Sequence, residues 1–150
     1  MTFVRVAFRR AMREAAMSLL EGYKADVGVG MQLYRARPHS IHPPTAFIDS
    51  IEETLTSRSV NLQERKPQVN IIVLHGRYDD GEAVDQGDAF VDGFLEWCAD
   101  RYHEAGSLTL LEPVATIDIP NFVADWLRTS SQPPPSYYAT QITLEGYTTS

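Results

Sequence analysis

The sequence has few features that would assign it to a specialised class of protein. One cysteine among 150 residues cannot form an internal disulfide, so nothing here requires an oxidising compartment. No apolar run approaches the roughly 20 residues that a membrane-spanning helix needs. The motifs G-x-G-x-x-G, G-x-x-x-x-G-K-[ST] and G-x-S-x-G are all missing. We therefore expect a soluble, intracellular protein, and the missing motifs weigh against an enzyme.

The composition is otherwise that of an ordinary globular protein. Hydrophobic residues make up 43% of the chain and aromatic residues 10%, which excludes wholesale disorder. A chain of 150 residues corresponds to about one domain. A protein of this size buries roughly 68–70% of the surface of its unfolded chain. We therefore expect a single domain over residues 1–150.

The net charge of −7 is spread unevenly along the chain. Residues 1–37 hold seven Lys or Arg and three Asp or Glu, whereas residues 38–150 hold six and seventeen. An acidic protein repels free nucleic acid by default. A basic end and an acidic body can also meet head to tail in an assembly, although an uneven distribution without any role is an equally simple interpretation.

Hydrophobic periodicity predicts an α+β fold. We expect a mixed or antiparallel sheet of about four to six strands, with an N-terminal helix and a second helix packed against it. Polar residues 56–67 are expected to form a long loop or an extended hairpin tip. The predicted elements are a helix at 2–22, strands at 31–37, 45–54 and 68–76, a helix at 85–105, one or two strands at 107–119 interrupted at Pro113, a short helix at 120–129 and a final strand at 137–147.

Candidate catalytic and metal-binding residues are weak. His39 and His42 have H-x-x-H spacing, but Pro38, Pro43 and Pro44 surround them, so this segment is not helical. The acidic cluster of residues 79–85 lacks the register of a calcium-binding loop and suits the start of the next helix. Cys98 falls on the apolar face of the second helix, where a thiol is usually inert. We assign no catalytic, metal-binding or cofactor-binding residue.

Two rows of like charge are more unusual. Arg5, Arg9 and Arg13 repeat at four-residue steps on the first helix, and an acidic row repeats at the same steps on the second. Like charges at this spacing destabilise a helix by a few tenths of a kcal/mol each. Either row is a solvated face, a subunit contact or the wall of a channel. The acidic row consists of Asp88, Asp92, Glu96 and Asp100, and further basic residues, Arg58, Arg65 and Lys66, lie in the polar segment.

The edges of the predicted sheet are a further candidate for subunit contact. An edge strand left unpaired is a template for another chain. If the final strand, residues 137–147, lies at an edge, it is placed to pair across subunits.

The layout resembles the tail terminator, or tail completion, proteins of long-tailed bacteriophages, including the lambda-type terminator. The resemblance covers nearly the whole chain and consists of element order rather than an invariant motif. It is carried by the N-terminal helix and by the segments LYRARPHSIHPPTAFID, VNIIVLHGRYDDG, DAFVDGFLEWCADRY and YYATQITLEGY.

The resemblance implies a virion protein, assembled in the host cytoplasm, with no enzymatic activity and no cofactor. It implies a homohexameric ring that caps the tail tube, ends its polymerisation and joins it to the head–tail connector or stopper protein. Genomic DNA would pass through the lumen without sequence-specific binding. Under this hypothesis the acidic row lines or flanks the lumen, and the arginine row, or Arg58, Arg65 and Lys66, contacts neighbouring rings.

Two other interpretations remain open from the sequence. A head–tail adaptor or stopper of the phage neck would also form a ring. A small enzyme or ligand-binding α+β domain would use His39, His42, His75 or the carboxylates of residues 79–85.

Overall fold

The computed structural model describes residues 2–28, 30–57, 63–77, 81–99, 109–129 and 131–148. Five strands form one sheet in the order β1-β2-β3-β5-β4, with β1 parallel to β2 and the other neighbours antiparallel. Two helices accompany this sheet, which confirms the predicted α+β fold. The elements are α1 (Thr2–Val27), β1 (Gln32–Tyr34), β2 (Thr45–Ser57), β3 (Gln63–Arg77), α2 (Gly81–Ala99), β4 (Thr109–Val123), the 3-10 helix η2 (Asp125–Leu127) and β5 (Ser136–Thr148).

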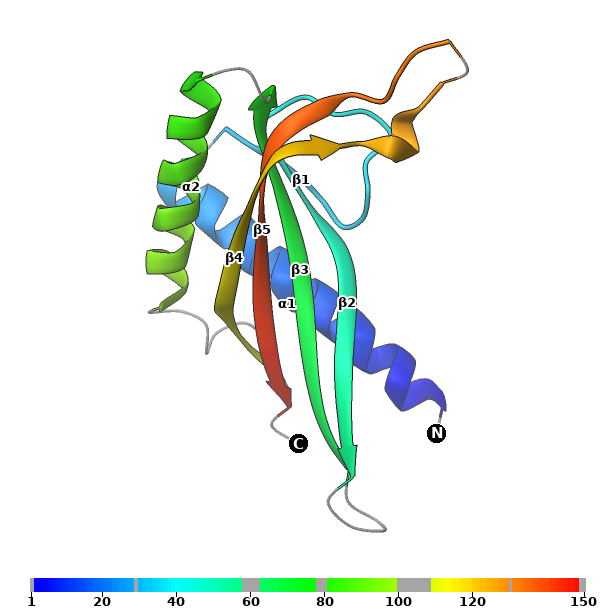
Figure 1. Ribbon diagram of the computed structural model, residues 1–150. Coiled ribbons are helices and arrows are strands. Elements are labelled where there is room, and N and C mark those ends of the chain that lie inside the picture. Colours follow the sequence, from blue (N-terminus) through cyan, green and yellow to red (C-terminus); the bar gives the residue numbers. More distant parts are fainter. Residues whose placement is uncertain are drawn as a thin grey trace.

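Both helices pack on the same face of the sheet and enclose the larger core. Figure 1 shows α1 running diagonally behind the strands, with α2 at the side where β4 lies. Apolar residues of α1, α2, β2, β3 and β5 form one buried cluster there. Tyr23 of α1 contacts the rings of Phe90, Phe94 and Trp97 of α2 edge to face, with centroids 5.2, 5.5 and 6.0 Å apart. Gly93 permits this approach, because a Cβ there would lie 2.4 Å from the Tyr23 hydroxyl.

The opposite face of the sheet is divided into two parts. At one end, Phe47, Phe122 and Trp126 pack edge to face under η2. Further along the strands, a polar ladder of Ser50, Asn70 and Thr143 crosses β2, β3 and β5. The Asn70 amide donates to Ser50 Oγ at 2.9 Å, and the Thr143 hydroxyl donates to Asn70 Oδ1 at 3.0 Å. Alternation along the strands therefore sends one set of apolar side chains to the helices, while the far face carries a smaller apolar cluster at one end and the polar ladder further along.

The predicted boundaries differ from the observed ones mainly at the hairpin. The strand predicted at 31–37 is only Gln32–Tyr34, and β2 runs to Ser57 before β3 begins at Gln63. In the described residues the polar segment is thus strand rather than long loop, as the extended-hairpin interpretation requires. Figure 1 shows this hairpin reaching beyond the rest of the sheet. Polar residues form strands here because every residue from Ser50 to Ser57 of β2 pairs with one of β3.

Predictions around β4 and β5 were wrong in three ways. Residues 109–123 form one strand that continues through both Pro113 and Pro120, and the helix predicted at 120–129 is reduced to the three residues of η2. The strand tolerates both prolines because β4 is an edge strand and its register shifts beside each of them. β5 is not an edge strand, since it pairs with β3 and β4. It lacks proline and can therefore hydrogen-bond on both sides.

Both predicted helices are confirmed, with shifted ends. α1 extends to Val27, and α2 begins at Gly81 rather than near residue 85. Residues 100–105, which the periodicity assigned to the second helix, lie outside the described residues. Within the described part of the chain, no helix combines the length and apolarity needed to cross a membrane.

Candidate functional site

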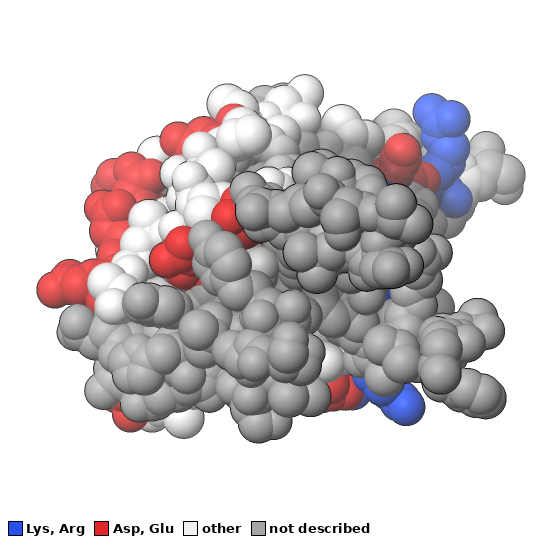
Figure 2. Space-filling view, turned by 90° about the horizontal axis from the view of Figure 1, so that it is seen from below, with Lys and Arg blue, Asp and Glu red and all other residues white. Residues whose placement is uncertain are grey.

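The acidic row lies on the solvent side of α2. Phe90, Val91, Phe94 and Cys98 occupy the buried side of this helix, so the row at Asp88, Asp92 and Glu96 is exposed. Asp100, its fourth predicted member, lies outside the described residues. The helix contains no Lys or Arg. Figure 2 shows Asp and Glu gathered on the side of the molecule that carries α2. The charged side chains of α2 are therefore all acidic.

The arginine row is partly used inside the subunit. Arg9 Nη1 donates to the carbonyl of Ile51 at 3.2 Å, and Arg13 Nη1 donates to the carbonyl of Arg35 at 2.6 Å. The other predicted basic residues are Arg5 in α1, Arg65 and Lys66 in β3, and Arg58, which lies outside the described residues. Arg9 and Arg13 thus tie α1 to the outer side of β2 and to the segment after β1.

These bonds protect one edge of the sheet from pairing with a further strand. This edge is formed by β1, β2 and the neighbouring part of α1, and we call it the arginine edge. β1 pairs with β2 only at residues 45–47, which leaves the rest of β2 without a neighbouring strand on that side in the described structure. Arg9 donates a hydrogen bond to one of the carbonyls of β2, that of Ile51. Ion pairs of Arg35 with Glu14 and of Arg37 with Asp49 add charge beside it. Charged side chains at a sheet edge oppose uncontrolled strand pairing.

The other edge, formed by the outer side of β4, has a different character; we call it the apolar edge. No described strand lies beyond β4. Val114, Ile117 and Val123 are 46%, 55% and 42% exposed. Residues 114–119 form a proline-free window between Pro113 and Pro120. Because each proline lacks an N–H, residues 114–119 are the longest run of β4 in which every residue has a backbone donor.

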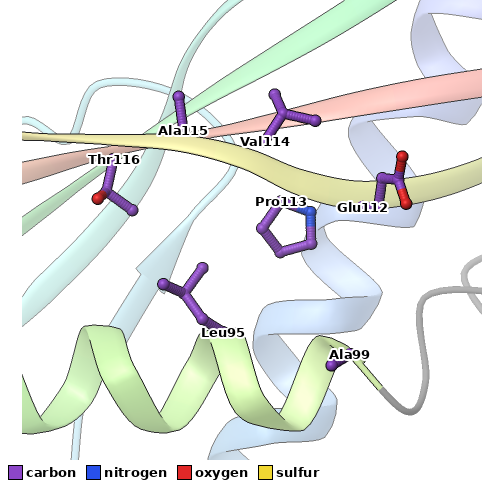
Figure 3. Close-up of a pocket in the computed structure, with 7 residues that line it drawn as sticks. All are labelled: Leu95, Ala99, Glu112, Pro113, Val114, Ala115 and Thr116. Carbon is purple, nitrogen blue, oxygen red and sulfur yellow. The ribbon is translucent and has the colours of Figure 1, made fainter.

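A groove of about 620 Å³ separates β4 from the end of α2. Figure 3 shows Pro113 and Thr116 pointing from β4 toward Leu95 of α2, while Val114 and Ala115 point away from the helix. Ala99 and Glu112 complete the lining. The groove thus offers an apolar surface between the exposed strand and the acidic helix.

The residues weighed as catalytic or metal-binding are not brought together. His39 and His42 are exposed in the segment between β1 and β2, while His75 is buried in β3. Of the acidic cluster, Glu82 and Asp85 lie in α2, and Asp79 and Asp80 fall outside the described residues. In the part of the chain that the structure describes, no three His, Cys, Asp or Glu side chains are grouped to hold a metal ion.

Two buried titratable groups have strongly shifted pKa values. Burial raises the pKa of the Cys98 thiol to about 12, so the sulfur stays protonated and unreactive at neutral pH. Burial lowers the pKa of His75 to about 4, and the carboxylate of Asp118 opposes this shift. His75 Nε2 lies 2.9 Å from Thr140 Oγ1, whose hydroxyl donates to Asp118 Oδ1 at 3.2 Å. A hydrogen-bonded chain therefore joins the buried imidazole to β4.

The sequence interpretation missed both this chain and the apolar edge. His75, Thr140 and Asp118 are far apart in the sequence, and no local pattern connects them. A signal for the apolar edge was present, because Pro113 and Pro120 bracket a run with four β-branched residues, Val114, Thr116, Ile117 and Ile119.

Comparison with known proteins adds no identity. No protein-family model matches this chain. No significant match was found among curated proteins.

Proposed function

We propose that this protein is a ring-forming structural subunit of a bacteriophage tail, of the tail terminator type. In this role it caps the tail tube, ends its polymerisation and joins it to the head–tail connector in the virion. The observation that carries the proposal is the pair of unlike edges on one sheet. The resemblance in element order supplies the biological setting for such a subunit.

Unlike edges favour a head-to-tail contact between copies. Such a contact closes into a ring when the rotation between neighbours closes. Pairing two apolar edges with each other would bring two α2 helices close together, and their acidic side chains would repel. Placing the apolar edge against the arginine edge of the next copy avoids this repulsion and lets arginine stems cover Val114 and Ile117.

The acidic row has a separate role in this proposal. Asp88, Asp92 and Glu96 point away from the sheet and thus remain available to the lumen. A lumen with negative walls repels the phosphate backbone, so genomic DNA passes without adhering and without being read in sequence. No cofactor or catalytic group is needed for this function.

A head–tail adaptor or stopper of the phage neck would use the same surfaces, and its partner distinguishes it from a terminator. A terminator binds tail-tube protein, whereas an adaptor binds the portal side. Sedimentation with each purified assembly therefore separates the two functions.

The primary test is the mass of the purified chain by light scattering over a range of salt and protein concentrations, with negative-stain images of large species. We expect a closed ring of six copies with a central hole, formed alone or on addition of tail-tube protein. A chain that stays monomeric at the highest concentration, with and without tail tubes, would contradict the proposal. High salt should weaken the ring, because exposed charges take part in the contact.

A further inference from the structure

A second cavity lies between β3, the first half of α2 and the residues just before β1 and β2. It has a volume of about 380 Å³. Met31, Pro44 and Phe90 give it apolar walls, and the exposed Gly30 and Gln86 stand at its rim. A cavity of this size is within the range that holds small organic groups in proteins. His75 is the one titratable side chain among its described lining residues.

The imidazole of His75 is held in a fixed position. The register of β3 against β5 passes from Leu74 to Gly76, so His75 lies in a bulge and has no opposite partner in that pairing. Its ring packs against Gly87 of α2, where a Cβ would lie 2.4 Å from ring atoms of His75. Gly87 thus allows the ring to fit between strand and helix while both residues line the cavity.

The hydrogen-bonded chain to Asp118 sets the tautomer of this imidazole. Thr140 has one hydroxyl hydrogen, which it donates to the Asp118 carboxylate at 3.2 Å. Its oxygen therefore accepts a hydrogen bond from His75, and we assign the ring proton to Nε2, 2.9 Å away. Nδ1 is then a lone-pair acceptor. With its pKa lowered to about 4 by burial, the ring is neutral at pH 7.

Nδ1 has no hydrogen-bond donor within reach among the described residues, although His75 is only 5% exposed. No fully buried side-chain nitrogen or oxygen in the described structure lacks a partner. Nδ1 is therefore not sealed off, and the space that His75 lines is the cavity. Nδ1 is thus a hydrogen-bond acceptor at an apolar cavity, and it suits an apolar ligand that carries one hydrogen-bond donor.

We propose that this cavity binds an aromatic group carrying a single N–H or O–H donor, of the indole or phenol class, which donates its hydrogen to Nδ1 of His75. Met31, Pro44 and Phe90 contact the ring of the ligand. The group is either a free small molecule or a tryptophan or tyrosine side chain of a partner protein. The exposed side chains of the apolar edge, Val114, Ile117 and Val123, do not line this cavity.

The test compares indole with 1-methylindole, which has the same ring and no donor. The full chain, labelled with nitrogen-15 in histidine, is titrated with each compound and the His75 ring nitrogens are followed by NMR. We expect indole to bind with a shift of the Nδ1 signal, and 1-methylindole to bind at least about tenfold more weakly, because it leaves the acceptor unpaired. Equal binding of the two compounds, or no binding of indole, would overturn the proposal.

Two variants test the positioning of the imidazole. Thr140→Val removes the acceptor for the Nε2 proton, so the tautomer is no longer fixed and indole should bind about tenfold more weakly, with little change for 1-methylindole. Thr143→Val is the matched control, because it removes a buried hydroxyl of the same strand that bonds Asn70 on the opposite face. Equal loss in both variants would contradict a role for the chain.

N-acetyltryptophanamide separates the two sources of the ligand. It presents the same indole attached to a peptide backbone. Binding as tight as that of indole indicates that the rim admits a side chain of a partner protein. Binding of indole alone assigns the cavity to a free small molecule.

Discussion

The two edges of the sheet differ in how far the rest of the described chain covers them. On the arginine edge, β1 covers residues 45–47 and Arg9 occupies the carbonyl of Ile51. On the apolar edge, the described chain supplies no covering strand, and Val114 and Ile117 are exposed. An exposed apolar edge is an aggregation hazard that proteins usually remove. In the proposed ring, the first edge is closed to strand pairing within the subunit and meets its neighbour through arginine side chains, whereas the second edge offers an uncovered strand to that neighbour.

Prolines shorten the regular part of the apolar edge. Pro113 and Pro120 interrupt the row of backbone donors of β4 on either side of residues 114–119, and the register shifts beside both. A partner must therefore match a short window rather than a long flat strand. In the proposed ring, the same two prolines would thus favour a specific contact and oppose uncontrolled pairing.

The largest expected effect comes from placing a charge in the window. Ile117→Lys should abolish ring assembly, because it puts an ammonium group where the neighbouring copy covers an exposed apolar side chain. The stability of the monomer should change by no more than about 0.5 kcal/mol, since the position is solvent-facing. Light scattering measures assembly and urea denaturation measures stability. Val27→Lys, at an equally exposed position on α1, is the matched control and should still assemble.

Lowering the pH should reduce the stability of the folded chain through His75, which is joined to β4 by hydrogen bonds. His75 is neutral when folded and has a pKa near 4, whereas in the unfolded chain it titrates near 6.5. The unfolded state therefore takes up the proton first, and the free energy of unfolding falls as the pH drops from about 6.5 to 4, by about 3 kcal/mol. Urea denaturation as a function of pH measures this. His75→Asn should reduce the slope, and His39→Asn, in an exposed segment, should keep it.

Removing the arginine that blunts the other edge should have a smaller effect. Arg9→Ala frees the carbonyl of Ile51 and should lower the free energy of unfolding by about 1 kcal/mol. It should also increase open-ended aggregation, because more of β2 becomes available for pairing. Arg10→Ala, the exposed neighbour on α1, should change neither property. If the two variants behaved identically in urea denaturation and turbidity, the proposed protective role of Arg9 at this edge would be contradicted.

Neutralising the acidic row should have the smallest effect on stability. The combined change Asp88→Asn, Asp92→Asn and Glu96→Gln removes two like-charge pairs at i, i+4 and should stabilise α2 by about 0.5 kcal/mol at low salt. In 1 M salt the gain should vanish, because the wild-type charges are then screened. Melting temperatures at both salt concentrations test this. Rings of this variant should also retain added DNA at low salt, which wild-type rings should not.

Local pattern predicted the elements whose signal is contained in their own residues. The run Ile71 to Leu74 marked a strand buried on both faces, and the stripes of both helices fell on the core as expected. Pro113 and Pro120 misled the prediction, because whether a proline breaks a strand depends on its place in the sheet. Strand order, which makes β5 central and β4 peripheral, depends on pairings between distant segments.

The candidate surfaces were predictable as charge rows but not as contacts. The acidic row was placed on an exposed helix face from its four-residue spacing alone. The internal bonds of Arg9 and Arg13 could not be foreseen, since their acceptor carbonyls lie 42 and 22 residues away in the chain. A periodic pattern identifies a face, but only the folded chain determines what that face meets.

The polar ladder on the far face has a consequence for strand alignment. Sliding β3 by one residue against its neighbours would turn its apolar residues away from the helices, so hydrophobicity forbids that error. Sliding by two residues keeps every side chain on its proper face, and hydrophobicity alone does not oppose it. Such a slip would move Asn70 away from Ser50 and Thr143, its partners in the present register, and leave a buried amide unpaired. Asn70 thus selects one alignment among those that the apolar pattern accepts.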